Sequence, residues 1–80
     1  MLLKHSLKVL VLRELTKHSQ LSFADLVVAT QATPGNLGKA IERLLATRYI
    51  LKVPTESRET VYQTSVKGNQ AYSVYKSQLK

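Results

Sequence analysis

The stretch from Thr33 to Ile50 reads TPGNLGKAIERLLATRYI and carries the clearest structural signal in the chain. Its apolar residues recur at i, i+3, i+4, i+7 and i+8, which places them on one face of an α-helix. These residues are Leu37, Ala40, Ile41, Leu44 and Leu45. Two glycines, Gly35 and Gly38, stand near the start, although each costs about 0.5–1 kcal/mol relative to alanine inside a helix. This weakened start needs an explanation.

The ends of this helix can be predicted from local signals. Thr33 is a good N-cap, and Pro34 follows at the first helical position, where its missing N–H costs nothing. We expect the helix to end at about Thr47 or Arg48.

A second, shorter helix is predicted just upstream. Ser22 is followed three residues later by Asp25, a variant of the capping box that predicts a helix over 23–30. Residues 31 and 32 then form the turn. Two helices joined by so short a turn match the helix-turn-helix motif, here over about 23–48.

The first helix is predicted from Leu3 to about Lys17. One face carries apolar side chains, namely Leu3, Leu7, Leu10 and Val11, with Leu15 near its edge. After this helix, either Leu21 or Phe23 is expected to contribute a short strand pairing.

The last third of the chain predicts a hairpin and a final helix. YILKVP over 49–54 is apolar and β-branched, ETVYQT over 59–64 alternates, and a polar turn lies between them, so 49–64 is a predicted wing. Ser65 caps a helix over about 65–80. The whole order predicts one domain, 1–80, that is mainly α with a small β-hairpin: a winged helix-turn-helix.

The composition points to the kind of partner. Twelve Lys and Arg against five Asp and Glu give a net charge of +7 on 80 residues. Such an excess favours nucleic acid first and an anionic membrane second, with simple solubility as the plain alternative. The chain has no cysteine and two histidines, so we expect neither a disulfide nor a metal nor any other cofactor.

The N-terminal residues predict the cellular location. Lys4 and His5 directly follow the first apolar residues, so there is no signal-peptide core, and no apolar run is long enough to span a bilayer. We expect a cytoplasmic protein with no membrane partner.

Three blocks of the chain resemble small winged-helix transcriptional regulators of the MarR/ArsR type. They are LSFADL at 21–26, TPGNLGKAIERLLATRYI at 33–50 and VYQTSVKGNQAYSVYKSQL at 61–79, and they comprise 43 of the 80 residues. The resemblance implies double-stranded DNA binding as a homodimer that controls transcription. The chain departs from the pattern at Gly38, where the group has a small hydroxyl, and at Arg48, where it commonly has glycine.

The face of the 33–48 helix opposite its apolar face is the predicted DNA-reading surface. A helix in the major groove turns its first turn toward base edges and its flanks toward phosphates. Gly35 would allow close approach, Asn36 can pair with adenine, and Lys39 can reach guanine or phosphate. The predicted DNA contacts are Thr33, Gly35, Asn36, Lys39, Arg43 and, at the tip of the wing, Arg58.

Each of these candidates also has a purely structural interpretation. Helix starts tolerate glycine at Gly35, Gly38 can allow close packing against the second helix, and capping alone explains Thr33. Glu42 lies on the same face and would repel phosphate, so a solvated charge is its expected role.

A homodimer is expected because one small domain reads few bases, whereas a dimer reads two half-sites. The predicted interface consists of Val9, Leu12, Tyr72, Tyr75 and Leu79. The same residues could all be intramolecular core. Whether a small-molecule effector is sensed is not evident from the sequence.

Catalysis is not expected. The chain has no nucleophile elbow, no paired carboxylates, no metal-ligand spacing and no phosphate-binding glycine loop. The second interpretation, from a different class, is a winged helix that serves as a protein–protein interaction module in a larger assembly.

Overall fold

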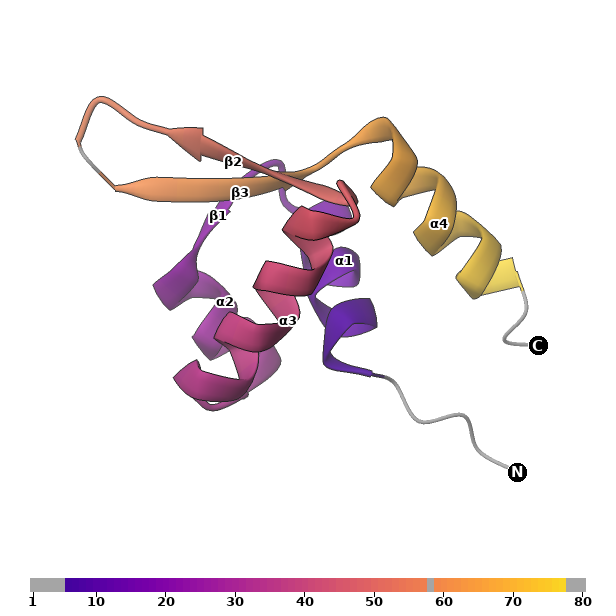
Figure 1. Cartoon of the computed structure of the whole chain (residues 1–80), viewed down its shortest axis with the longest axis horizontal. Helices are drawn as coiled ribbons and strands as arrows, with labels where there is room; N and C mark the ends of the chain where they lie inside the picture. The colour runs from indigo at the N-terminus through magenta and orange to yellow at the C-terminus, as the bar shows by residue number, and fades with distance from the viewer. Residues whose placement is uncertain (1–5, 58, 78–80) are drawn as a thin grey trace.

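A computed structural model of the chain describes residues 6–57 and 59–77. Four helices and three short strands follow one another in the predicted order (Figure 1). The elements are α1 (Leu7–Lys17), β1 (Leu21–Ser22), α2 (Phe23–Thr30), α3 (Pro34–Ala46), β2 (Ile50–Pro54), β3 (Thr60–Thr64) and α4 (Val66–Ser77). The molecule is therefore a winged helix-turn-helix, mainly α with a small sheet.

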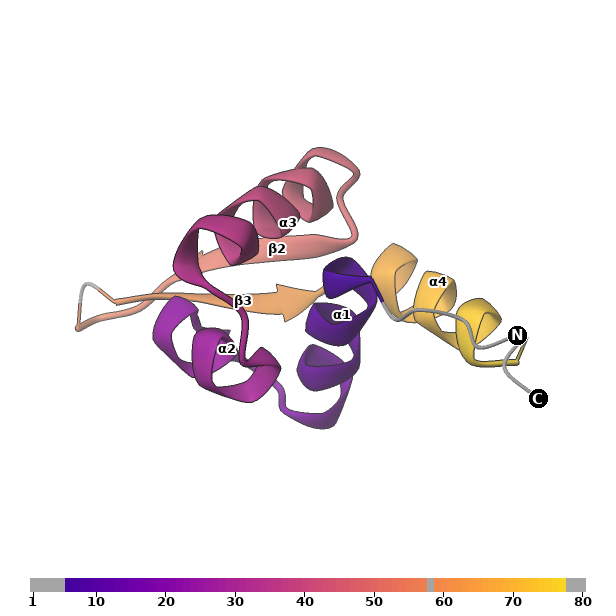
Figure 2. The same cartoon turned by 90° about the horizontal axis from the view of Figure 1, so that it is seen from below.

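The sheet is antiparallel, with strand order β1-β3-β2. The hairpin of β2 and β3 pairs Ile50 with Thr64 at its base and Pro54 with Thr60 near its tip. Of the two residues predicted to pair as a short strand, Leu21 does so, opposite Tyr62, whereas Phe23 begins α2. The hairpin projects from one end of the molecule and α4 lies at the other end (Figures 1 and 2).

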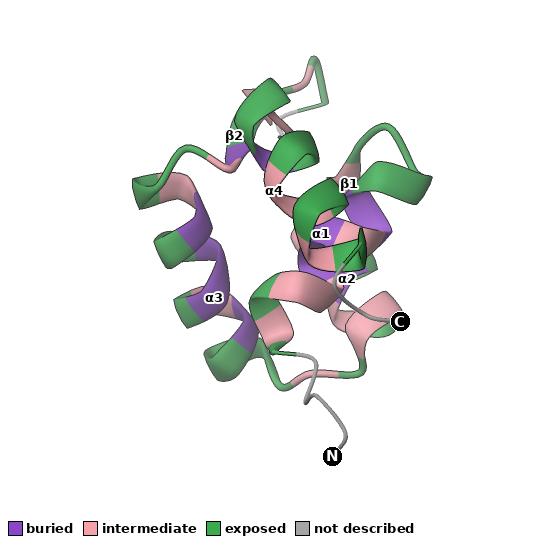
Figure 3. Ribbon diagram, turned by 90° about the vertical axis from the view of Figure 1, so that its right-hand side faces the viewer, coloured by how far each residue is buried: buried purple, intermediate pink, exposed green. Residues whose placement is uncertain are grey.

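The core lies between the first three helices and the base of the hairpin. It contains Val11, Leu12, Leu15, Leu26, Leu37, Ile41, Leu44, Ile50 and Tyr62. The predicted apolar face of α3 is the one turned inward, as Figure 3 shows by its buried residues, and Leu45 at its edge is half-buried. Burial of this face fixes α3 and leaves its opposite side to solvent.

Side-chain caps set the helix boundaries. Ser22 accepts a hydrogen bond from the Asp25 amide at 3.1 Å, and the Asp25 carboxylate accepts one from the Ser22 amide at 3.3 Å. Thr33 caps α3 by accepting from the Asn36 amide at 3.3 Å. The predicted N-termini of both helices are confirmed, and α3 ends at Ala46 with Thr47 as its C-cap.

The predicted start of the first helix is wrong. Ser6 has an extended backbone (φ −67°, ψ 157°), and its hydroxyl accepts a hydrogen bond from the Val9 amide at 3.3 Å. A helix cannot run through an extended residue, so α1 begins at Leu7. The predicted start, Leu3, lies outside the described residues.

The turn that leaves α3 is tied to the start of α4. Arg48 has a left-handed backbone (φ 63°), a conformation that glycine adopts more readily than other residues. The Ser65 hydroxyl lies 2.6 Å from the Arg48 carbonyl and 3.1 Å from the Tyr49 carbonyl, and it accepts from the Gly68 amide at 3.0 Å. The predicted cap at Ser65 is therefore present, and it also anchors α4.

Candidate nucleic-acid interface

The outer face of α3 is open to solvent. Five of the six predicted DNA contacts lie on it or at its cap, and all five are exposed: Thr33, Gly35, Asn36, Lys39 and Arg43. Neither the chain's own hairpin nor any other described element covers them (Figures 1 and 3). The surface that DNA recognition requires is thus available in this chain.

The two glycines of α3 are not required by packing. A Cβ atom added at Gly35 or Gly38 would meet no atom of the described neighbours within 4 Å. The interpretation that Gly38 allows close packing against α2 is therefore wrong. Gly35 stands in the exposed first turn, where the missing side chain leaves the backbone accessible to an incoming molecule.

The start of α3 favours an anion. Its first turn contains no acidic residue, and the free N–H groups of a helix N-terminus carry partial positive charge. The Thr33 hydroxyl already accepts the Asn36 amide, so capping is its observed role, although its own proton remains available to donate. Phosphate or the acceptor edge of a base would suit this end of the helix.

The two cations on this face are not neutralised within the chain. Among the described residues, neither Lys39 nor Arg43 makes an ion pair, whereas Arg13 pairs with Glu14 at 3.1 Å. Glu42 is also exposed and lies on the same helix, so the face is mixed and not uniformly basic.

A shallow depression of about 380 Å³ runs along one flank of α3 toward α1. It is lined by Ser6, Leu7, Lys8, Asn36, Lys39, Ala40 and Arg43. Asn36, Lys39 and Arg43 of this set are predicted DNA contacts, whereas Lys8 is not among the predicted contacts. No sequence pattern could place Lys8 here, because packing of α1 against α3 brings it into position.

The wing carries the remaining candidate. Thr55 closes the turn through hydrogen bonds to the Ser57 hydroxyl at 3.0 Å and to the Glu59 carbonyl. Lys52 is exposed on β2. Arg58 lies outside the described residues, so its contact with DNA stays a prediction.

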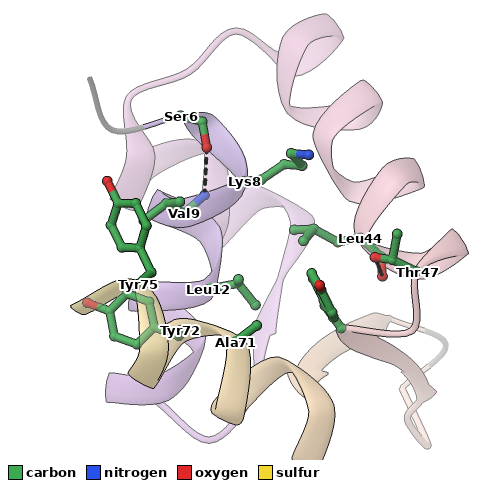
Figure 4. A pocket seen from close by; sticks show the side chains of 10 residues that line it. Ser6, Lys8, Val9, Leu12, Leu44, Thr47, Ala71, Tyr72 and Tyr75 are labelled. Carbon is green, nitrogen blue, oxygen red and sulfur yellow. Dashed lines mark hydrogen bonds between the residues drawn. The ribbon is translucent and has the colours of Figure 1, made fainter. Parts of the chain in front are cut away.

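The predicted dimer residues lie around a groove between α1 and α4. Val9, Tyr72 and Tyr75 are half-buried and line a volume of about 270 Å³ together with residues of the α3–β2 junction (Figure 4). Leu12 also lines this groove, although it is only 5% exposed and packs in the chain's own core, so its contact with a partner stays a prediction. Leu79 lies outside the described residues.

α4 is also fixed to the end of α3 through Lys67. Its ammonium donates to the Thr47 carbonyl at 3.0 Å and lies 5.2 Å from the centre of the Tyr49 ring. Lys67 thus links the start of α4 to the residues that follow α3.

In the described part of the chain, no three His, Asp or Glu side chains gather where they could hold a metal ion. Within the same residues, no helix is long and apolar enough to cross a membrane.

No protein-family model and no curated protein matches this sequence. Several solved structures are similar to the chain. BpsR of Bordetella bronchiseptica, whose DNA binding is regulated by 6-hydroxynicotinic acid, is 21% identical with a TM-score of 0.79, over 86% of this chain and 54% of its own. MepR, a transcription regulator of the Staphylococcus aureus multidrug efflux pump MepA, is 18% identical with a TM-score of 0.84, over 90% of this chain and 55% of its own.

A MarR-family transcriptional regulator from Silicibacter pomeroyi is also similar, with 18% identity and a TM-score of 0.80 over 85% of this chain and 47% of its own. The chain thus spans about half the length of these structures. At such identities the likeness shows the fold, and that fold is the winged helix of MarR-family regulators, as the sequence resemblance predicts.

Proposed function

We propose that this chain is the DNA-binding unit of a transcriptional regulator, with α3 in the major groove of double-stranded DNA. The observation that carries the proposal is the outer face of α3, where an accessible, side-chain-poor first turn stands beside two cations that have no acidic partner in the described chain. The regulators that share the fold support it, since BpsR is a DNA-binding protein and MepR a transcription regulator.

In this proposal each residue of the face has a distinct task. Gly35 lets the backbone approach the base edges, and Asn36 reads adenine through its side-chain amide. Lys39 contacts guanine or phosphate. Arg43, further along the flank, and Thr33, at the cap, contact the backbone, which sets the register of the helix in the groove.

The β2–β3 hairpin would lie along the backbone or the minor groove, with Arg58 at its tip as the contact. This places the wing beside the groove that α3 enters. The hairpin projects away from the core, so it can reach past the edge of α3 (Figure 1).

We further propose that the regulator acts as a homodimer in the cytoplasm, because two half-sites about one helical turn apart give the affinity that a single small domain lacks. The groove lined by Val9, Leu12, Tyr72 and Tyr75 is the proposed interface, and Leu79, outside the described residues, stays a predicted contact. Val66 and Val74, which are 74% and 57% exposed on α4, offer a second apolar side. Sedimentation of the full chain measures its mass and tests dimerisation independently of DNA binding.

The DNA proposal is tested by affinity for duplex DNA over a salt series. For a DNA binder, the logarithm of the association constant falls linearly with the logarithm of salt concentration, with a slope of about −0.9 per phosphate contact. Changing Lys39→Ala and Arg43→Ala together is expected to flatten that slope. The control is Lys17→Ala with Lys76→Ala, which removes the same charge from α1 and α4 away from the face.

An equal loss in both double variants would mean that net charge alone drives binding and would contradict the placement on α3. No salt-dependent binding at all would favour the protein–protein interaction module, in which the exposed face of α3 would meet another protein.

A further inference from the structure

We propose that Lys8, at the start of α1, is a further phosphate-contacting residue that widens the DNA surface from one helix to two. The inference rests on the proposed function and deepens it. It concerns a residue that lies far from the helix-turn-helix in the sequence and that only the packing of the chain brings to the same surface.

The position of Lys8 follows from the depression beside α3. Lys8 is exposed and lines the α1 side of this depression, opposite Asn36, Lys39 and Arg43 on the α3 side. Figure 4 shows its side chain reaching from α1 toward α3. A single molecule in the depression would therefore meet side chains from both helices.

The spacing between the two helices is set by the core. α1 buries Val11 and Leu15 completely or nearly so, at 0% and 2% exposure, in the same cluster as Leu37 and Ile41 of α3. Close packing of this kind resists relative movement of the helices. Lys8 is thus held beside the recognition helix by the fold, although its own side chain is free to extend.

The charges around the depression call for an anion. Lys8, Lys39 and Arg43 contribute three positive charges, no carboxylate lines the depression, and none of the three makes an ion pair with another described residue. Two other cations of the chain have partners within it: Arg13 pairs with Glu14, and Lys67 donates to the Thr47 carbonyl. A phosphate group would relieve the repulsion among the three.

The position of Lys8 favours a contact with the DNA backbone over a contact with a base. Base edges are read from the first turn of a recognition helix, while an adjacent helix meets the strand that borders the groove. Contacts to phosphate position the protein and carry no sequence information. Lys8 should therefore strengthen binding to every duplex by a similar factor.

The test compares the full chain with Lys8→Ala, Lys8→Arg and Lys17→Ala in duplex binding over a salt series, on a preferred duplex and on an unrelated one. Lys17 is the matched control, because it is an exposed lysine at the opposite end of the same helix. For Lys8→Ala we expect a slope reduced by about 0.9 and a threefold to tenfold weaker affinity at about 0.1 M salt on both duplexes. Lys8→Arg keeps the charge and should keep the slope.

The possible outcomes distinguish the role of Lys8 from the proposed DNA binding by α3. Lys8→Ala could have the same salt slope as the wild type and Lys17→Ala, while the double variant Lys39→Ala with Arg43→Ala still has a flatter slope. That result would overturn the role of Lys8 and leave the proposed function intact. If the α3 variant has no effect either, the proposed DNA face itself fails. Because Lys8 also lines the groove between α1 and α4, sedimentation of Lys8→Ala must give the wild-type mass; a changed mass would assign the loss to assembly and overturn the inference.

Discussion

Gly35 and Gly68 are the same residue type under opposite constraints. Around Gly35 a Cβ would meet nothing, so the fold does not demand glycine there. At Gly68 a Cβ would overlap the Tyr49 carbonyl oxygen, so the fold excludes every other residue unless α4 shifts. Packing within the chain accounts for Gly68, whereas Gly35 needs an explanation in terms of a binding partner.

Gly35→Ala is therefore expected to separate stability from binding. Alanine should raise the free energy of unfolding by about 0.5 kcal/mol, a modest gain because the site is in the first turn, and weaken affinity for duplex DNA because the added methyl blocks close approach. Urea denaturation and fluorescence anisotropy measure the two effects.

Gly38→Ala is the control for that experiment, since Gly38 is half-buried on the flank of α3 and also has room for a Cβ. It should stabilise by up to about 1 kcal/mol and leave DNA affinity close to that of the wild type. If Gly35→Ala binds DNA as tightly as Gly38→Ala, close approach at Gly35 is not needed.

Gly68→Ala should lower the free energy of unfolding, whereas Gly35→Ala and Gly38→Ala should raise it. The methyl would collide with backbone that already accepts hydrogen bonds from Ser65, so we expect a loss of about 1–3 kcal/mol of unfolding free energy. Thermal and urea unfolding measure it, with Gln70→Ala on the exposed side of α4 as the control. A Gly68→Ala protein as stable as the control would show that α4 can move away freely.

At the scale of the elements, the boundaries that could be predicted are those set by local chemistry. Ser22 with Asp25, Thr33 with Pro34, and Ser65 each signal a helix start within a few residues of sequence, and each cap forms. The first helix was placed too early because its apolar spacing continues upstream of Ser6. Periodicity marks a face but does not tell where a helix ends, whereas a capping hydroxyl does.

Ser65 does more than cap α4, and its removal should show this. Ser65→Ala deletes the hydrogen bonds of the hydroxyl to the turn after α3 and to the Gly68 amide. We expect a loss of about 1–2 kcal/mol, because a helix cap and the hydrogen bonds to the Arg48 and Tyr49 carbonyls are lost together. Urea denaturation of Ser65→Ala and of Ser73→Ala, an exposed serine of the same helix, gives the comparison. Equal stability of the two variants would contradict the anchoring role.

At the scale of the whole molecule, the arrangement of surfaces depends on tertiary packing. The sequence predicts which face of α3 is polar, but not that Lys8 borders it, because that requires the relative placement of α1 and α3. The same holds for Leu12: an apolar residue off the main stripe of α1 can face a partner or the chain's own core, and here it packs in the core while also lining the groove beside α4.

The two proposed working surfaces of the molecule are neighbours that share Ser6 and Lys8 at the start of α1. The DNA face is on the outer side of α3, and the groove proposed for the partner subunit lies between α1 and α4. Lys67 and Ser65 link α4 to the residues that end α3.

The three glycines of the chain offer the most direct test of the central claim, that duplex DNA meets the outer face of α3. Backbone amide spectra of nitrogen-15-labelled protein are recorded as a short duplex is added. We predict the largest shift for Gly35, a smaller one for Gly38, and little change for Gly68, which is buried beneath Tyr49. An unchanged Gly35 resonance at saturating duplex would contradict the account.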